Sequence, residues 1–163
     1  MTTLLGPPLD TDLLLDLWVA GDPAPQGSKR AFRNKHSGKI QQVESSKRVA
    51  PWREDIRQAV LAETVTRSLV TAEPLAVELD FRLRRPVAHH ISANRARPVR
   101  ANAPTHPAGK PDVDKLARAV LDAIGSAGTV WVDDSQVVTL TAAKRYAINN
   151  TTGVDIRVRR AIP

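Results

Sequence analysis

The sequence predicts an α+β fold, in which a small mixed or antiparallel β-sheet packs against two main helices, within a single domain of 163 residues (1–163). This length fits one domain and leaves little room for a second. Hydrophobic residues make up 42% of the chain and charged residues 25%, which excludes wholesale disorder. The predicted elements run strand, helix, strand, helix and then strands, an order typical of α+β proteins rather than of a regular βα alternation.

The first half of the chain holds three predicted elements. The segment Asp12–Ala20 has the leucine, valine and tryptophan content of a buried strand, and it ends in a turn rich in Gly and Pro at 21–27. A helix is predicted over about Lys47–Thr66, with Ser45 and Ser46 as N-cap candidates and with Pro51 tolerated in its first turn. Its apolar stripe consists of Trp52, Ile56, Val60 and Leu61. The segment Leu75–Leu83 alternates between apolar and charged residues, the period of a half-buried strand.

The second half begins with a long segment, Arg84–Lys110, that contains four prolines and almost no hydrophobic periodicity. A loop of this length in a compact domain is usually functional or disordered, so we expect a mobile basic loop at about 85–110. A helix follows at Val113–Ile124, with an apolar stripe of Val113, Leu116, Ala117, Val120, Leu121 and Ile124. The remaining predicted strands are Val130–Val132, Gln136–Tyr146 and Gly153–Arg159.

The composition of the chain excludes several classes of protein and of functional site. The chain carries 24 Lys and Arg against 17 Asp and Glu, a formal net charge of +7, and it contains no cysteine. The absence of cysteine excludes disulfides, cysteine-ligated zinc and a thiol nucleophile. No apolar run approaches the roughly 18 residues that span a bilayer, and the first ten residues do not form a secretory signal. We therefore expect a cytoplasmic protein with an anionic partner.

The basic residues lie in two segments. The first, Gly27–Arg48, holds seven basic residues against one acid, and the second, Arg84–Lys110, holds six basic residues and three histidines but no acid. Both segments would attract a polyanion, although solvated loops would have the same composition. His89 and His90 could form a metal pair, but adjacent histidines in a basic loop more often contact DNA or have no role.

Acidic residues gather immediately after the second basic segment. Asp112 is placed at the N-cap of the predicted helix, where a carboxylate can accept backbone N–H groups. Asp114, Lys115, Arg118 and Asp122 share the helix face opposite the apolar stripe. Asp133 and Asp134 lie in a turn between two predicted strands, and an Asp-Asp-Ser turn needs no functional explanation.

If the two acidic clusters converge, they form a metal site. Several carboxylates within a few ångströms repel one another unless they bind a hard cation. Oxygen ligands without His or Cys suit Mg²⁺ or Mn²⁺, which keep water ligands and approach phosphate oxygens. In a basic protein this arrangement is typical of a metal-dependent phosphodiesterase. Ordinary helix and turn acids remain the alternative.

Two motifs resemble a known family. Residues 110–123 read KPDVDKLARAVLDA, and residues 131–137 read WVDDSQV, with Lys144-Arg145-Tyr146 beyond them. Together they resemble the RusA family of Holliday junction resolvases, whose core has D-x-D, a basic helix position, and then D-D-x-Q-V. The segment GDPAPQGS at 21–28 also resembles the opening of phage-type members.

The resemblance implies a site and a substrate. Asp112, Asp114 and Asp134 would be the catalytic, metal-binding carboxylates, with Mg²⁺ as the cofactor and Mn²⁺ as a substitute. Arg118 stands where the family has lysine and Lys115 where it has asparagine, and a guanidinium cannot serve as a readily deprotonated acid. Asp133, Lys115 and Asp122 would be supporting residues, with Asp133 positioning the metal shell and Asp122 pairing with Arg118. The residues expected to bind DNA are Lys29, Arg30, Arg33, Lys35, Arg95, Arg97, Arg100 and Lys110.

The family architecture implies a symmetric homodimer that makes paired symmetric nicks in four-way junctions and other branched DNA, in a bacterial or phage-infected cytoplasm. Two alternatives stay open. One is a branched-DNA binding protein without useful cleavage, because Lys115 and Arg118 depart from the family pattern. The other is a nuclease of flaps or other branched DNA on the same fold.

Overall fold

The computed structural model describes residues 12–27, 30–33, 40–43, 47–67, 69–92 and 98–162. Its main sheet has four strands in the order β1-β6-β4-β5, in which β4 and β5 are parallel and the other neighbours antiparallel. The strands are β1 (Leu13–Ala20), β4 (Leu75–Leu83), β5 (Val137–Tyr146) and β6 (Gly153–Arg160). The predicted α+β class and mixed sheet are confirmed.

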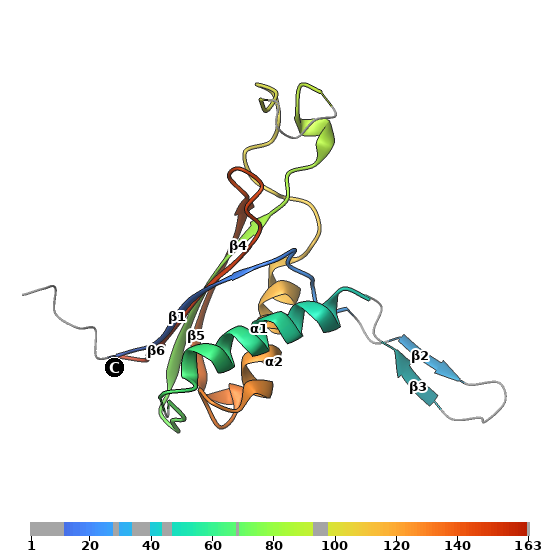
Figure 1. The fold of residues 1–163 in the computed structure, drawn as a ribbon. Helices are drawn as coiled ribbons and strands as arrows, with labels where there is room; N and C mark the ends of the chain where they lie inside the picture. Colours follow the sequence, from blue (N-terminus) through green and yellow to red (C-terminus); the bar gives the residue numbers. More distant parts are fainter. Residues whose placement is uncertain are drawn as a thin grey trace, which may run out of the picture.

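Two helices cover one face of this sheet, as Figure 1 shows: α1 (Val49–Thr64) and α2 (Val113–Ala127). After β4 the chain makes a long excursion, the segment 84–112 between β4 and α2. It then returns through α2 to the parallel strand β5, which is the crossover connection that a parallel pair requires. The core lies between the sheet and the helices, with Phe81, Ile156 and Leu116 fully buried. Pro51 lies in the first turn of α1, as predicted.

The buried face of α2 is broader than its predicted stripe. Leu116, Val120 and Ile124 are buried as expected, and so are Ala119 and Ala123, which the stripe did not include. The reason is that α2 packs against α1 as well as against the sheet, so small residues beside the stripe are covered too. This packing leaves the opposite face of α2 exposed.

The structure differs from the sequence expectation in one strand, in the start of α1 and in an additional hairpin. The predicted strand Val130–Val132 is wrong, because only Trp131 forms an isolated bridge, to Thr71. Helix α1 begins at Val49 with Arg48 at the N-cap position, while the expected caps Ser45 and Ser46 lie outside the described residues. A hairpin of β2 (Arg30–Arg33) and β3 (Ile40–Val43), which the sequence analysis did not predict, extends away from the body in Figure 1.

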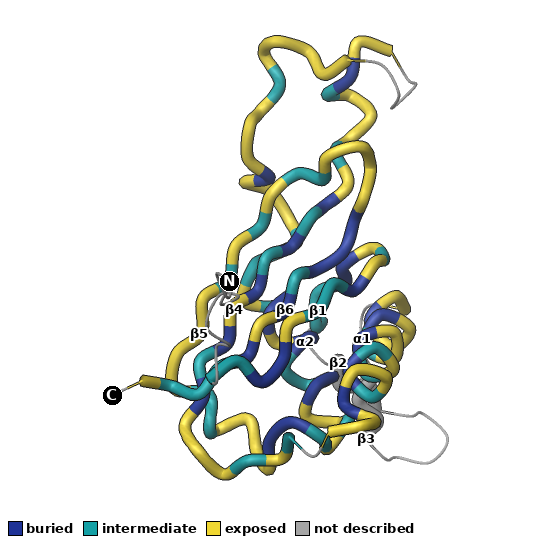
Figure 2. Tube along the Cα trace, turned by 60° about the vertical axis from the view of Figure 1, so that its left-hand side comes forward, coloured by how far each residue is buried: buried dark blue, intermediate teal, exposed yellow. Residues whose placement is uncertain are grey.

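The excursion between β4 and α2 rises beyond the end of the sheet, and Figure 2 shows that most of its described residues are exposed. It contains a short 3-10 helix, η1 (Val87–His89), and a bridge between His90 and Val99. The backbone N–H of Arg100 donates to the carbonyl of His89 at 2.9 Å. Within the described ranges, no helix is both long enough and apolar enough to cross a bilayer.

Candidate active site

The first turn of α2 presents Asp112 beside a lysine. Asp112 occupies the N-cap position with extended backbone angles, but its carboxylate makes no capping hydrogen bond, so the predicted capping role is wrong. Instead its Oδ2 lies 3.0 Å from the Nζ of Lys115, one turn further along the helix. The hydrogen bond from Lys115 is the main reason why the pKa of Asp112 lies below its ordinary value, and Lys110 and Lys144 add to it. Asp112 is therefore ionised at neutral pH.

The exposed face of α2 continues the site. Asp114 and Arg118 are both exposed on it, as the helical spacing predicted. Arg118 makes no ion pair or hydrogen bond within the part of the chain that the structure describes, so its guanidinium is available to an incoming anion. The expected partner of Arg118 is engaged elsewhere: Asp122 lies 3.8 Å from Arg53 of α1, because the packing of the two helices brings that arginine over it.

A short 3-10 helix, η2 (Asp134–Gln136), carries the second acidic pair. Asp133 caps it, since its Oδ1 accepts a hydrogen bond from the Ser135 N–H at 2.8 Å, and hydrogen bonds from Ser135 lower the pKa of Asp133. The observed contacts of Asp133 thus hold the turn. Asp134, by contrast, is exposed and presents its carboxylate to solvent.

Gln136 holds this turn in place, a role that the sequence analysis missed. Its Oε1 accepts hydrogen bonds from the N–H groups of Val132 and Asp133, at 2.9 and 3.0 Å. Its Nε2 donates to the carbonyls of Thr71 and Glu73, at 2.8 and 3.0 Å. The capping-box spacing D-x-x-Q at 133–136 could have predicted the first pair of bonds.

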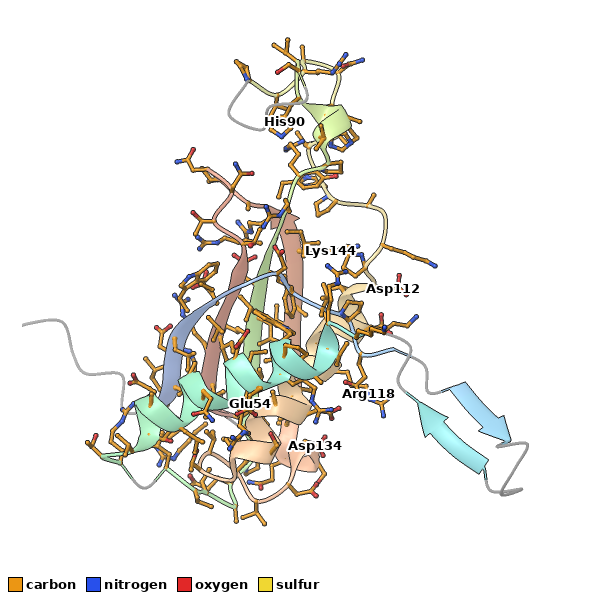
Figure 3. All side chains as sticks on the ribbon, turned by 45° about the vertical axis from the view of Figure 1, so that its right-hand side comes forward. Glu54, His90, Asp112, Arg118, Asp134 and Lys144 are labelled. Atoms are coloured by element: carbon orange, nitrogen blue, oxygen red, sulfur yellow. The ribbon has the colours of Figure 1, made fainter. Side chains whose placement is uncertain are left out.

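The two acidic clusters lie at opposite ends of α2. Figure 3 shows Asp112 at the start of the helix, Arg118 further along, and Asp134 beyond it at the turn. The helix has 15 residues, and at about 1.5 Å per residue its length keeps the two ends apart. Among the described residues, no three His, Asp or Glu side chains form a group that could hold a metal ion. The predicted convergence of all three aspartates is therefore absent from the single chain.

Lys144 of β5 supports the approach to Asp112, and the sequence analysis assigned it no role. Its Nζ donates to the carbonyl oxygens of Gly109 and Pro111, at 2.6 and 2.8 Å. These residues directly precede Asp112, and the bond between Lys110 and Pro111 is cis. Lys144 therefore fixes the chain that leads into the acidic turn at the start of α2, which carries Asp112 and Asp114.

The Gly- and Pro-rich segment at 21–27 lies against the first turn of α2. The N–H of Gln26 donates to the carbonyl of Lys115 at 2.9 Å, and the carboxylate of Asp22 pairs with Arg84 at 3.1 Å. A shallow hollow of about 290 Å³ between them is lined by Asp22, Arg48, Arg84 and Pro111. Basic side chains thus border the start of α2.

The residues expected to bind DNA are placed unevenly. Lys29, Lys35, Arg95 and Arg97 lie outside the described residues, and Arg30 and Arg33 belong to the strand β2. Arg100 is exposed, but its Nε donates to the carbonyl of His90 at 2.7 Å, so part of its guanidinium is used within the excursion. Lys110 is exposed next to the candidate site.

Comparison with protein families identifies the region that holds the candidate site. The model of the endodeoxyribonuclease RusA family matches residues 20–159, which include both acidic clusters and the excursion between them. A search of curated proteins finds no match.

Proposed function

Since the chain belongs to the RusA family of endodeoxyribonucleases, which makes it a Holliday junction resolvase, we propose that it cuts four-way and other branched DNA by paired symmetric nicks that depend on Mg²⁺. The observation that carries the proposal is an exposed, ionised acidic turn at the start of α2, bordered by basic side chains, within the matched region. Nucleases of this family generally depend on a divalent metal.

The chemistry of the donor set suits Mg²⁺. Asp112, Asp114 and Asp134 offer carboxylate oxygens only, and since Asp114 and Asp134 are exposed and Asp112 is half-buried, there is room for the water ligands that Mg²⁺ retains. Such a cation polarises a phosphoryl oxygen and lowers the pKa of a bound water. The residues of the chain do the rest: Lys115 keeps Asp112 ionised, and Arg118 offsets the negative charge of the scissile phosphate. Because a guanidinium stays charged, Arg118 binds the phosphate and donates no proton to the leaving group.

We infer that a symmetric homodimer completes the carboxylate set. One chain holds Asp112 and Asp114 at one end of α2 and Asp134 at the other. A two-fold axis that brings Asp134 of one subunit to the start of α2 in its partner does so in both directions, because the same surfaces face each other. Two equivalent sites result, and two symmetry-related cuts are what resolution of a four-way junction requires.

The test is cleavage of a synthetic four-way junction. We expect paired nicks at symmetry-related positions with Mg²⁺ or Mn²⁺, and little cleavage with Ca²⁺, whose larger and looser coordination misplaces the attacking water. Cleavage confined to flaps would favour the nuclease of other branched DNA. Salt-dependent binding without cleavage in any metal would favour the binding protein, and either result would contradict the proposal.

A further inference from the structure

A hollow of about 350 Å³ lies between the end of the sheet and the excursion that leads to α2. Its wall is formed by the ring of Tyr146 at the end of β5, by His89 and by three prolines, Pro86, Pro104 and Pro107. Its floor includes Gly109, Lys110 and Pro111, so it ends one residue before Asp112. Anything bound in it therefore lies next to the candidate active site.

Two basic side chains hold the walls of the hollow in position. The guanidinium of Arg85 lies over the ring of Tyr146, 4.0 Å from its centroid, and its Nη1 donates to the carbonyl of Pro104 at 2.8 Å. Lys144 holds the floor through its bonds to Gly109 and Pro111. The hollow is thus built by specific contacts within the excursion and between the excursion and β5.

The lining is suited to a planar group attached to an anion. It contains no carboxylate, and Lys110 supplies positive charge at its edge, while Arg84, which also lines it, is paired with Asp22. The rings of Tyr146 and His89 meet edge to face with centroids 5.6 Å apart, and the prolines add apolar surface. The Nδ1 of His89 is buried without a hydrogen-bond partner among the described residues, so a ligand with a polar edge would satisfy it.

The size of the hollow selects one nucleotide. Its volume lies at the lower end of the range of about 300–1,000 Å³ for small-molecule sites, enough for one nucleotide but not for a base still stacked between its neighbours in a duplex. A base must therefore leave its helix before it can enter. Unstacking costs least where regular stacking is already interrupted, as at the branch point of a junction, where strands pass from one helix to another.

We propose that this hollow takes one unstacked nucleotide of the cleaved strand, adjacent to the scissile phosphate, and so determines which phosphodiester bonds of a branched DNA are cut. The inference rests on the proposed function and extends it to substrate selection. The base lies against Tyr146 and His89, and its phosphate faces Lys110.

The test combines a filled hollow with a missing base. Ala108 is exposed and lines the hollow, so Ala108→Trp fills it without disturbing the core. Ala101→Trp is the matched control, because Ala101 is exposed on the same excursion and does not line the hollow. The second perturbation is a junction that lacks the base next to the principal cleavage position.

We expect Ala108→Trp to lower cutting at that position by about tenfold, equivalent to about 1.4 kcal/mol, and Ala101→Trp to leave it unchanged. Removal of the base should cause a similar loss in the wild type and no further loss in Ala108→Trp, since both perturbations remove the same contact. Equal cutting by all three proteins, or losses that simply add, would overturn the inference. Either result requires a wild type that cuts junctions, so it is distinct from failure of the proposed function.

Discussion

The contacts of Lys144 make it the clearest test of how the acidic turn is positioned. Lys144→Met removes the ammonium group and keeps most of the side-chain length. Two hydrogen bonds from this ammonium are lost, one partly buried and one exposed. Because bonds to charged groups contribute about 1.5–3 kcal/mol when well shielded and less in solvent, the free energy of unfolding should fall by about 2 kcal/mol. For a chain of this length the melting temperature should then fall by about 4–8 °C.

We expect Lys144→Met to lower the cleavage rate by a larger factor than its loss of stability would explain. Once the chain at 109–111 loses its anchor, Asp112 shifts, and a misplacement of about 1 Å can reduce a rate by about a hundredfold. The assays are urea unfolding and single-turnover cleavage of a four-way junction. Lys110→Met is the control, because it removes the same charge from the exposed neighbouring side chain and should change stability by less than about 0.5 kcal/mol. If the two variants behave alike, Lys144 acts only as a charge and the positioning argument is refuted.

Three further predictions follow from the site and the sheet. Asp114→Asn should abolish cleavage but leave junction binding intact or tighter, because it removes a proposed metal ligand and a negative charge from an exposed position. Asp133→Asn should keep most of the activity, since asparagine also caps, whereas Asp134→Asn should lose it. The pKa of Asp133 is lowered in the folded state, so the ionised carboxylate stabilises the fold above pH 3.8, and this stabilisation is lost as the pH falls below that value. Asp133→Asn should remove this pH dependence from acid unfolding curves. Gly153→Ala should lower the free energy of unfolding by about 3 kcal/mol, because a Cβ there would lie 2.2 Å from the carbonyl oxygen of Val19.

Each prediction has an outcome that contradicts it. Cleavage by Asp114→Asn within about tenfold of the wild type would remove Asp114 from the metal site. Equal losses in Asp133→Asn and Asp134→Asn would mean that the turn matters only as a turn. For Gly153, the control is Gly109→Ala, because a Cβ at Gly109 meets nothing within 4 Å. Equal stability of the two glycine variants would show that β1 and β6 separate readily.

Local patterns in the sequence predicted most of the fold. The alternation of Leu75–Leu83 and the stripe of α2 are periodic signals of burial, and both elements formed as expected. The strand at Val130–Val132 failed because a short apolar run does not show whether a neighbouring strand is within reach, and here only Trp131 bridges to Thr71. Parallel pairing of β4 with β5 depends on a long crossover, which periodicity does not encode.

The candidate site was less predictable than the fold. Spacing correctly placed Asp114 and Arg118 on the exposed face of α2. It could not show that Lys115 takes the carboxylate of Asp112, or that Arg53 of another helix takes Asp122, because these pairings depend on how the helices pack. The sequence likewise could not show that Asp112 and Asp134 lie apart, because that depends on how α2 is placed in the fold.

The central claim is that Asp112 and Asp114 of one subunit act with Asp134 of its partner, and mixing two inactive variants tests it most directly. Asp112→Asn and Asp134→Asn should each fail to nick a four-way junction in Mg²⁺. In a mixed dimer both substitutions fall in one site and the other site is intact, so an equal mixture should recover about a quarter of the wild-type nicking. If each site is built within one subunit, every site in the mixture carries a substitution, and the absence of recovered nicking in verified mixed dimers would contradict the account.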